Sequence, residues 1–135
     1  MTSIPDEYRD LFETRSFAFV ATLLPDGAPH VTPTWVDYDG EYVLVNTVLD
    51  NRKDRNVRRD PRVTLAVADP ENPYRYLSIR GEVIERREQG AREHLNELAE
   101  RYTGQAEYPG PGGDRVIHVV RPDAVSGQSP PGRRE

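Results

Sequence analysis

Short apolar and β-branched segments, separated by tight turns, most strongly limit what this chain can fold into. Two of the turns, Pro25-Asp26-Gly27 and Tyr38-Asp39-Gly40, end in Asp-Gly, a dipeptide typical of β-hairpins. The first segment is nearly all apolar, so we expect both of its faces to be covered. The sequence predicts six strands, at residues 17–24, 29–37, 42–47, 62–69, 74–87 and 116–120.

Helices are predicted in only three places. Residues 3–15 and 89–103 place apolar side chains at helical spacing. A shorter helix starts at Asp50 or Asn51, either of which can cap it, and ends near Pro61, which cannot continue it. This order of elements predicts a mainly β fold class with few helices: a six-stranded antiparallel split β-barrel rather than a doubly wound sheet.

Glycine and proline mark the remaining features of the chain. Gly81 interrupts the fifth strand and predicts a bulge or bend. Residues 104–114 form a loop rich in both residue types. Residues 126–135 contain Gly, Ser and two adjacent prolines, which predicts a mobile tail. We therefore place the single domain at residues 1–127 and the tail at 128–135.

Composition excludes several classes of protein. With 36% hydrophobic and 30% charged residues, the chain is lean for a monomer of 135 residues and fits a domain that buries more surface by dimerising. It has no cysteine, and its three histidines (His30, His94, His118) lack metal-ligand spacing, so no metal is expected. It shows neither a signal-peptide pattern nor an apolar run of membrane-spanning length, so we expect a cytoplasmic protein with no membrane partner.

The short predicted helix carries a concentrated positive charge. Residues 51–62 hold six basic and two acidic residues in a chain of net charge −5. Arg52 and Asn56 share a helix face, and Thr47 adds a hydroxyl from the end of the preceding strand. Together with Lys53, taken to be exposed, they predict a phosphate site at the helix start, without a glycine-rich loop. The alternative is a solvated basic helix paired with nearby acids, the usual meaning of a charge run.

Several blocks of sequence occur in an order found in one known family. They are residues 21–29 (ATLLPDGAP), 32–36 (TPTWV), 38–40 (YDG), 53–63 (KDRNVRRDPRV) and 69–76 (DPENPYRY), followed by Arg80-Gly81. With these blocks the chain resembles, from about residue 11 to 127, the pyridoxamine-phosphate-oxidase-like split β-barrel flavoproteins. Within them it is most similar to the reductases that depend on the deazaflavin coenzyme F-420.

The resemblance implies a homodimer with two cofactor sites at the subunit interface, each holding coenzyme F-420 or, as the alternative, FMN. The implied positions are Thr32, Pro33, Thr34, Trp35 and Val36 along the ring, Thr47, Arg52, Lys53 and Asn56 around the phosphate, and Tyr74 and Tyr76 from the partner subunit. Asn46 is a further expected cofactor-binding position. The chain departs from the family at Asn51, where some relatives carry a basic residue. It also lacks the C-terminal Arg and Trp signature of the true oxidases, which argues against vitamin B6 oxidation.

Single aromatic residues allow two interpretations each. Trp35, the only tryptophan, can form a wall for the ring or belong to the barrel core, and we slightly favour the core. Tyr74 and Tyr76 alternate with Arg75 and face one way, where they can approach the ring, donate a proton or pack at a dimer interface. His118, inside the last strand, is interpreted as structural.

The residues suggest no catalytic side chain, because there is no Ser/His/Asp arrangement, carboxylate pair or cysteine nucleophile. That pattern fits an enzyme whose cofactor supplies the chemistry. The leading hypothesis is an oxidoreductase that passes a hydride from reduced F-420 to an unsaturated small organic substrate. The alternatives are an FMN-dependent oxidoreductase, a cofactor carrier without turnover and, ranked last because the chain is acidic elsewhere, a nucleic-acid-binding module.

Overall fold

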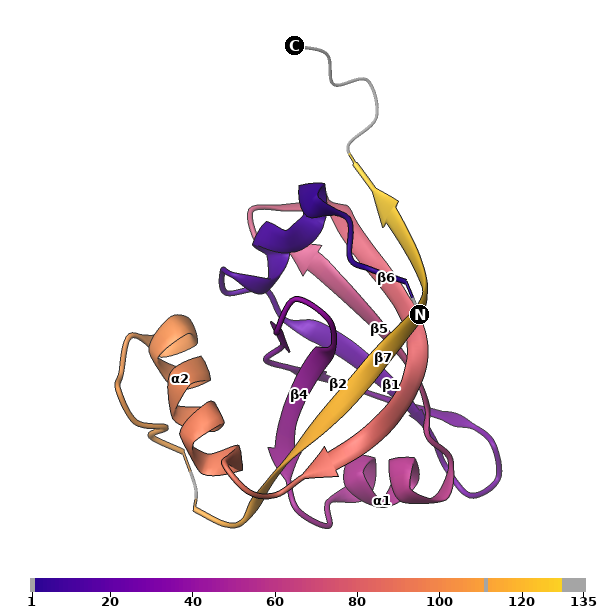
Figure 1. Ribbon diagram of the computed structural model, residues 1–135, viewed down its shortest axis with the longest axis vertical. Helices are drawn as coiled ribbons and strands as arrows, with labels where there is room; N and C mark the ends of the chain where they lie inside the picture. The colour runs from indigo at the N-terminus through magenta and orange to yellow at the C-terminus, as the bar shows by residue number, and fades with distance from the viewer. Residues whose placement is uncertain (1, 111, 130–135) are drawn as a thin grey trace.

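The structure is a computed structural model that describes residues 2–110 and 112–129 (Figure 1). Within these residues the chain forms seven strands, two α-helices and one 3-10 helix. The elements are η1 (Asp6–Phe12), β1 (Ala18–Leu23), β2 (Pro29–Thr34), β3 (Asp37–Tyr38), β4 (Val43–Val48), α1 (Arg52–Arg59), β5 (Arg62–Asp69), β6 (Asn72–Arg87), α2 (Ala91–Thr103) and β7 (Arg115–Gln128).

The strands form one antiparallel sheet in the order β2-β1-β5-β6-β7-β4-β3, which curls into a half-barrel (Figure 1). This confirms the predicted mainly β split barrel, but the count of six strands was wrong by one. The predicted strand 29–37 divides, because β2 ends at one edge of the sheet and Asp37 and Tyr38 pair with β4 at the other edge. Trp35 and Val36 connect the two edges.

The longest pairing in the sheet joins β6 and β7, and it bends at Gly81. The register shifts between Arg80 and Gly81, and a Cβ at Gly81 would lie 2.0 Å from the carbonyl oxygen of Arg121. Only glycine allows the two backbones to approach so closely. The bend predicted at this glycine is therefore confirmed.

The core lies on the concave face of the sheet. Val20, Leu65 and Ile79 lie side by side on β1, β5 and β6 and are almost completely buried. At the upper end of Figure 1, η1 adds Leu11 and Phe12 to the same cluster. The helix predicted over residues 3–15 is thus real but shorter, a 3-10 segment of seven residues.

Helix α2 covers the other side of the barrel and packs on β4 and β7. Its buried residues follow the predicted stripe, with Ala91, Leu95, Leu98, Ala99 and Tyr102 facing the protein. Glycines bound the helix: Gly90 and Gly104 both have φ near +80°, a conformation that glycine adopts without strain. The predicted packing helix is confirmed.

The last strand is much longer than predicted. Ser126, Gly127 and Gln128, expected at the start of a tail, pair with Ser78, Leu77 and Tyr76 of β6. The prediction failed here because these residues lack an apolar alternation, and their pairing depends on β6, which is also long. Residues 130–135 of the predicted tail lie outside the described residues.

The convex face of the sheet keeps several large apolar side chains exposed. Phe19 is 50% exposed, and its neighbours across the sheet are Pro33 on β2 and Ala66 on β5. Val31 and Tyr74 are also exposed. A single chain therefore leaves one face of the apolar first strand uncovered. No helix among the described residues is long and apolar enough to cross a membrane.

Candidate functional site

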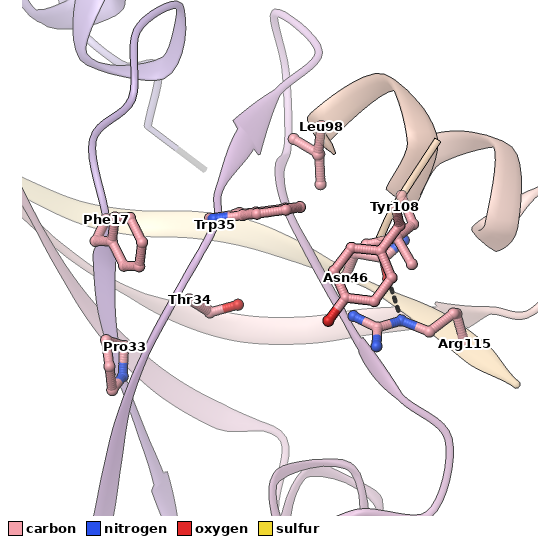
Figure 2. A pocket seen from close by; sticks show the side chains of 9 residues that line it. Phe17, Pro33, Thr34, Trp35, Asn46, Leu98, Tyr108 and Arg115 are labelled. Carbon is pink, nitrogen blue, oxygen red and sulfur yellow. Dashed lines mark hydrogen bonds between the residues drawn. The ribbon is translucent and has the colours of Figure 1, made fainter. Parts of the chain in front are cut away.

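A cavity of about 270 Å³ opens between the end of β2, strand β4 and helix α2 (Figure 2). One side is aromatic and aliphatic, and the other is polar. It is lined by Phe17, Pro33, Thr34, Trp35, Asn46, Leu95, Leu98, Tyr108 and Arg115. Four of the residues predicted for the cofactor, Pro33, Thr34, Trp35 and Asn46, are thus brought together here.

Three aromatic rings fix the aromatic wall. Trp35 stacks on Tyr102 at 4.9 Å between ring centroids and meets the edge of Tyr108 at 5.8 Å. The hydroxyl of Tyr102 accepts from the backbone amide of Val36 at 3.1 Å and donates to the carbonyl of Ser16. Burial raises the pKa of Tyr102, so its hydroxyl stays protonated. Trp35 is therefore packed on a buried residue and also forms a wall of the cavity, and its contact with a cofactor ring stays a prediction.

Arg115 and Asn46 form the polar side of the cavity. The Nε of Arg115 donates to Oδ1 of Asn46 at 3.0 Å, and its guanidinium lies 5.5 Å from the ring centre of Tyr108. Figure 2 shows the guanidinium beside the Tyr108 hydroxyl, on the side facing Thr34. Arg115 is half-buried, and burial lowers its pKa, yet an arginine remains charged in proteins. Arg115 was not predicted from the sequence, which placed it between a loop and a strand.

Lys53 is buried, contrary to the prediction of an exposed lysine. It is only 7% exposed and makes no hydrogen bond or ion pair with the rest of the described chain. Burial, together with the nearby charge of Arg115, lowers the pKa of Lys53 to about 8. A largely buried cation without an acidic partner among the described residues is costly.

The start of α1 is fixed by Asn51, one of the two residues predicted to cap it. Its Oδ1 accepts from the backbone amide of Asp54 at 2.9 Å, and its Nδ2 donates to Thr47 Oγ1 at 2.7 Å. Thr47, at the end of β4, is buried, whereas Arg52 is exposed on the first turn. The predicted phosphate residues Thr47, Arg52 and Lys53 therefore gather around one helix start.

Asp54 is the centre of a buried network that the sequence did not reveal. Arg86 donates to both of its carboxylate oxygens at 2.8 and 2.7 Å, and His118 Nε2 lies 2.8 Å from Oδ1. Burial alone would raise the pKa of Asp54, but the hydrogen bonds from Arg86 and His118 outweigh it and hold that pKa below its usual value. These bonds fasten α1 to β6 and β7, and they confirm a structural role for His118.

A second pair, which is partly buried, includes His94, a neighbour of Asn46 in the cavity lining. His94 Nε2 is 3.0 Å from Oδ2 of Asp37, and Arg101 donates to Oδ1 of the same carboxylate at 2.8 Å. Burial by itself would raise the pKa of Asp37, but the hydrogen bonds from His94 and Arg101 lower it to about 2. No local pattern in the sequence indicated this pair, because its members lie far apart in the chain and meet only through the packing of α2.

Eight predicted cofactor residues do not line this cavity in the single chain: three of them lie at the start of α1, and the other five lie elsewhere. Asn56 is fully buried and holds α1 to β1, because its Nδ2 donates to Thr22 Oγ1 at 3.0 Å. Val36 is buried in the core, and Thr32 has a buried hydroxyl without a partner in the part of the chain that the structure describes. Tyr74 and Tyr76 are exposed on β6, the former at 73%.

Comparison with known proteins places this geometry among split-barrel proteins. The family model described as pyridoxamine 5'-phosphate oxidase matches residues 4–129. A solved structure named F420 reductase is 39% identical, with a TM-score of 0.80, and the match covers 91% of this chain and 98% of the other. A comparison with curated proteins gave no match.

Two further solved structures share the fold. A conserved hypothetical protein of Mycobacterium tuberculosis, Rv2991, is 27% identical with a TM-score of 0.72, over 93% of this chain and 84% of that one. HupZ of Group A Streptococcus is 19% identical with a TM-score of 0.69, over 92% and 93% of the two chains, and at this identity the likeness concerns the fold alone. The chain belongs to the pyridoxamine 5'-phosphate oxidase-like split-barrel family, on the branch that includes F420 reductase.

Proposed function

We propose that the protein is an oxidoreductase that uses reduced coenzyme F-420 to reduce an unsaturated small organic substrate. Membership of the family supports a flavin- or deazaflavin-type oxidoreductase, and the similarity to F420 reductase favours the deazaflavin. The observation that carries the proposal is Lys53, a largely buried cation that has no counterion among the described residues and is close enough to Arg115 of the cavity to feel its charge.

The phosphate of the cofactor is assigned to the start of α1. Lys53 offers the ammonium of a largely buried side chain, Thr47 a hydroxyl and Arg52 a second positive charge. The free backbone amides of the first helical turn and the helix dipole favour an anion at the same place. An anion here would offset the cost of burying Lys53, so the residues fit a phosphate-bearing cofactor.

The ring of the cofactor is assigned to the cavity beside Trp35. Pro33, Thr34 and Trp35 supply an apolar surface on which a flat ring can lie, and Leu95 and Leu98 close it from α2. These side chains exclude water and orient the bound molecules. When bound, the reduced deazaflavin supplies a hydride, the substrate gains that hydride and a proton, and the cofactor is left oxidised.

The protein is further proposed to act as a homodimer in which Tyr74 and Tyr76 approach the partner's site. The support is the exposed apolar convex face, with Phe19 half exposed on it. Light scattering at micromolar concentration should give twice the chain mass of 15.4 kDa, and a monomeric mass with cofactor present would contradict this assignment. The cytoplasmic location predicted from the sequence stays a prediction.

An FMN-dependent oxidoreductase is the alternative, because one phosphate site can serve either cofactor. Titrating the purified protein with F-420 and with FMN while recording absorbance separates the two, and we expect the tighter complex with F-420. Oxidation of the bound reduced cofactor by unsaturated carbonyl compounds then separates an enzyme from a cofactor carrier. Binding of neither cofactor would overturn the proposal.

A nucleic-acid-binding role remains the weakest of the hypotheses. Two of the four arginines of α1 that it would need are engaged within the protein. Arg58 pairs with Asp50 and Asp54, and Arg59 donates to the carbonyl of Leu23. The same α1 charges that suggested a basic surface therefore serve in part to hold the helix in place.

A further inference from the structure

Arg115 has more hydrogen-bonding capacity than the protein uses. Its Nε donates to Asn46, and this is the single hydrogen bond of the side chain within residues 2–110 and 112–129. The two terminal nitrogens belong to a half-buried guanidinium that borders the cavity. A planar guanidinium with two free nitrogens on one side matches an oxyanion such as a carboxylate or a phosphate.

The amide of Asn46 is held in one orientation. Its Oδ1 must face Arg115, because arginine can only donate. Its Nδ2 then uses both hydrogens, one toward the carbonyl of Ala91 at 2.8 Å and one toward Nδ1 of His94 at 3.2 Å. Asn46 is buried, so water does not compete for these contacts. The position of the Arg115 guanidinium is thus set by an amide that cannot turn over freely.

His94 completes the arrangement in one tautomer. Since its Nδ1 accepts from Asn46, its proton lies on Nε2, which donates to Asp37 at 3.0 Å. Asp37 is itself held by Arg101. The order of contacts from β3 to the cavity is therefore Asp37, His94, Asn46 and Arg115, and each hydrogen bond has one donor and one acceptor assigned.

We propose that Arg115 binds an oxyanion carried by the ligand of the cavity, and that Asp37, His94 and Asn46 are positioning residues that hold its guanidinium there. The proposal deepens the proposed function, since it concerns the same cavity. The oxyanion has two possible sources, the carboxylate of an unsaturated substrate and the phosphate of the cofactor. Both are recognised by the same chemistry, and the experiment separates them.

The test compares two pairs of probes that differ in charge but little in shape. Cinnamate and cinnamamide represent the substrate carboxylate, and FMN and riboflavin represent the cofactor phosphate. Isothermal titration should show that the wild type prefers the anionic member of at least one pair, and that Arg115→Met reduces this preference by about 10- to 100-fold, the range of a charge-assisted hydrogen bond.

The pair in which the preference is lost identifies the source of the oxyanion. An unchanged preference in both pairs, or no preference in the wild type, would overturn the proposal. Loss of preference for cinnamate in a protein that binds neither FMN nor F-420 would support Arg115 as an anion site while removing the proposed function. The two ideas can therefore fail separately.

Asn46→Asp tests the positioning step with a nearly isosteric change. The new carboxylate pairs with Arg115 and neutralises it, so the preference for the anionic probe should fall as far as in Arg115→Met. Affinity for the neutral probe should stay within about threefold, whereas general damage to the cavity would lower both affinities. Gln105→Glu is the matched control, because it adds the same charge at an exposed position after α2 and should leave both affinities unchanged.

His94 provides the second test. His94→Asn keeps an oxygen acceptor near the position of Nδ1, whereas His94→Leu removes it. We expect the asparagine variant to retain most of the preference for the anionic probe and the leucine variant to lose about tenfold, in keeping with the loss of one hydrogen bond beside a charged group. Equal preference in the wild type and both variants would remove His94 and Asp37 from the positioning role.

Discussion

Lys53 and Asp54 are neighbours on the first turn of α1, and both are buried, but their surroundings differ completely. Asp54 receives hydrogen bonds from Arg86, His118 and Arg58. Lys53 has no such partner in the described chain. A buried charge that is fully paired holds the helix to the barrel, whereas a buried charge without a partner destabilises the protein until something binds it. We therefore assign a structural role to Asp54 and propose a ligand-binding role for Lys53.

The largest expected effect concerns the paired charge. Asp54→Ala leaves Arg86 and His118 facing an empty space, and breaking a buried pair in this way costs about 3–5 kcal/mol. Urea unfolding of the variant should show this loss. Asp123→Ala is the control, because Asp123 pairs with Arg121 on an exposed part of β7 and its removal should matter far less. Equal losses of unfolding free energy in the two variants would show that the buried Asp54 network stabilises the protein no more than an exposed ion pair does.

The second prediction uses the lowered pKa of Lys53. Between about 8, its pKa in the folded chain, and 10.5, its ordinary value, the unfolded chain holds a proton on this lysine that the folded chain has lost. The free energy of unfolding without ligand should therefore rise with pH across this interval, by at most about 3 kcal/mol. Lys53→Met should remove this rise, and parallel pH curves for the two proteins would contradict the burial argument.

The third prediction concerns binding by the unpaired charge. Lys53→Met should weaken FMN or F-420 binding by about 10- to 100-fold, because a charge-assisted contact contributes roughly 1.5–3 kcal/mol. Riboflavin, which lacks the phosphate, should bind both proteins alike. Arg59→Met is the control, since Arg59 contacts Leu23 and Asn56 and lies far from the first turn. Equal losses of affinity in the two variants would show that α1 acts only through its general positive charge.

The smallest effect is expected at Arg52. Its side chain is exposed beside the helix start, where water and salt screen its charge. Arg52→Ala should reduce FMN affinity by less than about fivefold, since exposed charge pairs contribute about 0–1 kcal/mol. Titration at low and high salt checks this, because the small loss should vanish at high salt. A loss of FMN affinity as large as that of Lys53→Met would show that the exposed Arg52 binds the phosphate as strongly as Lys53 does.

Local signals in the sequence predicted much of the fold. The Asp-Gly turns, the cap at Asn51 and the stripe on α2 depend on residues a few positions apart, and the structure has all three. The division of residues 29–37 between β2 and β3 could not be predicted from local sequence. It depends on the curl of the whole sheet, which brings the two edges close enough for Trp35 and Val36 to connect them. The length of β7 likewise depends on the distant β6.

The candidate site was only partly predictable for the same reason. Trp35, Asn46 and Lys53 were found through a resemblance and a local charge pattern. Arg115 and His94 were missed, because their roles arise from contacts across 69 and 48 positions of the chain with Asn46. The burial of Lys53 was also missed, since a lysine in a basic run gives no sign that its neighbours cover it.

The central claim is that Lys53 is kept buried for the anion of a ligand. The most direct test is whether the wild type or Lys53→Met has the larger free energy of unfolding, measured without and with ligand. Urea unfolding at pH 7 of the wild type and of Lys53→Met should show the variant to be the more stable protein without ligand, because a buried methionine carries no unpaired charge. With saturating F-420 the order should reverse, since only the wild type gains the charge-assisted contact. A variant that is less stable than the wild type under both conditions, with the same difference, would contradict the account.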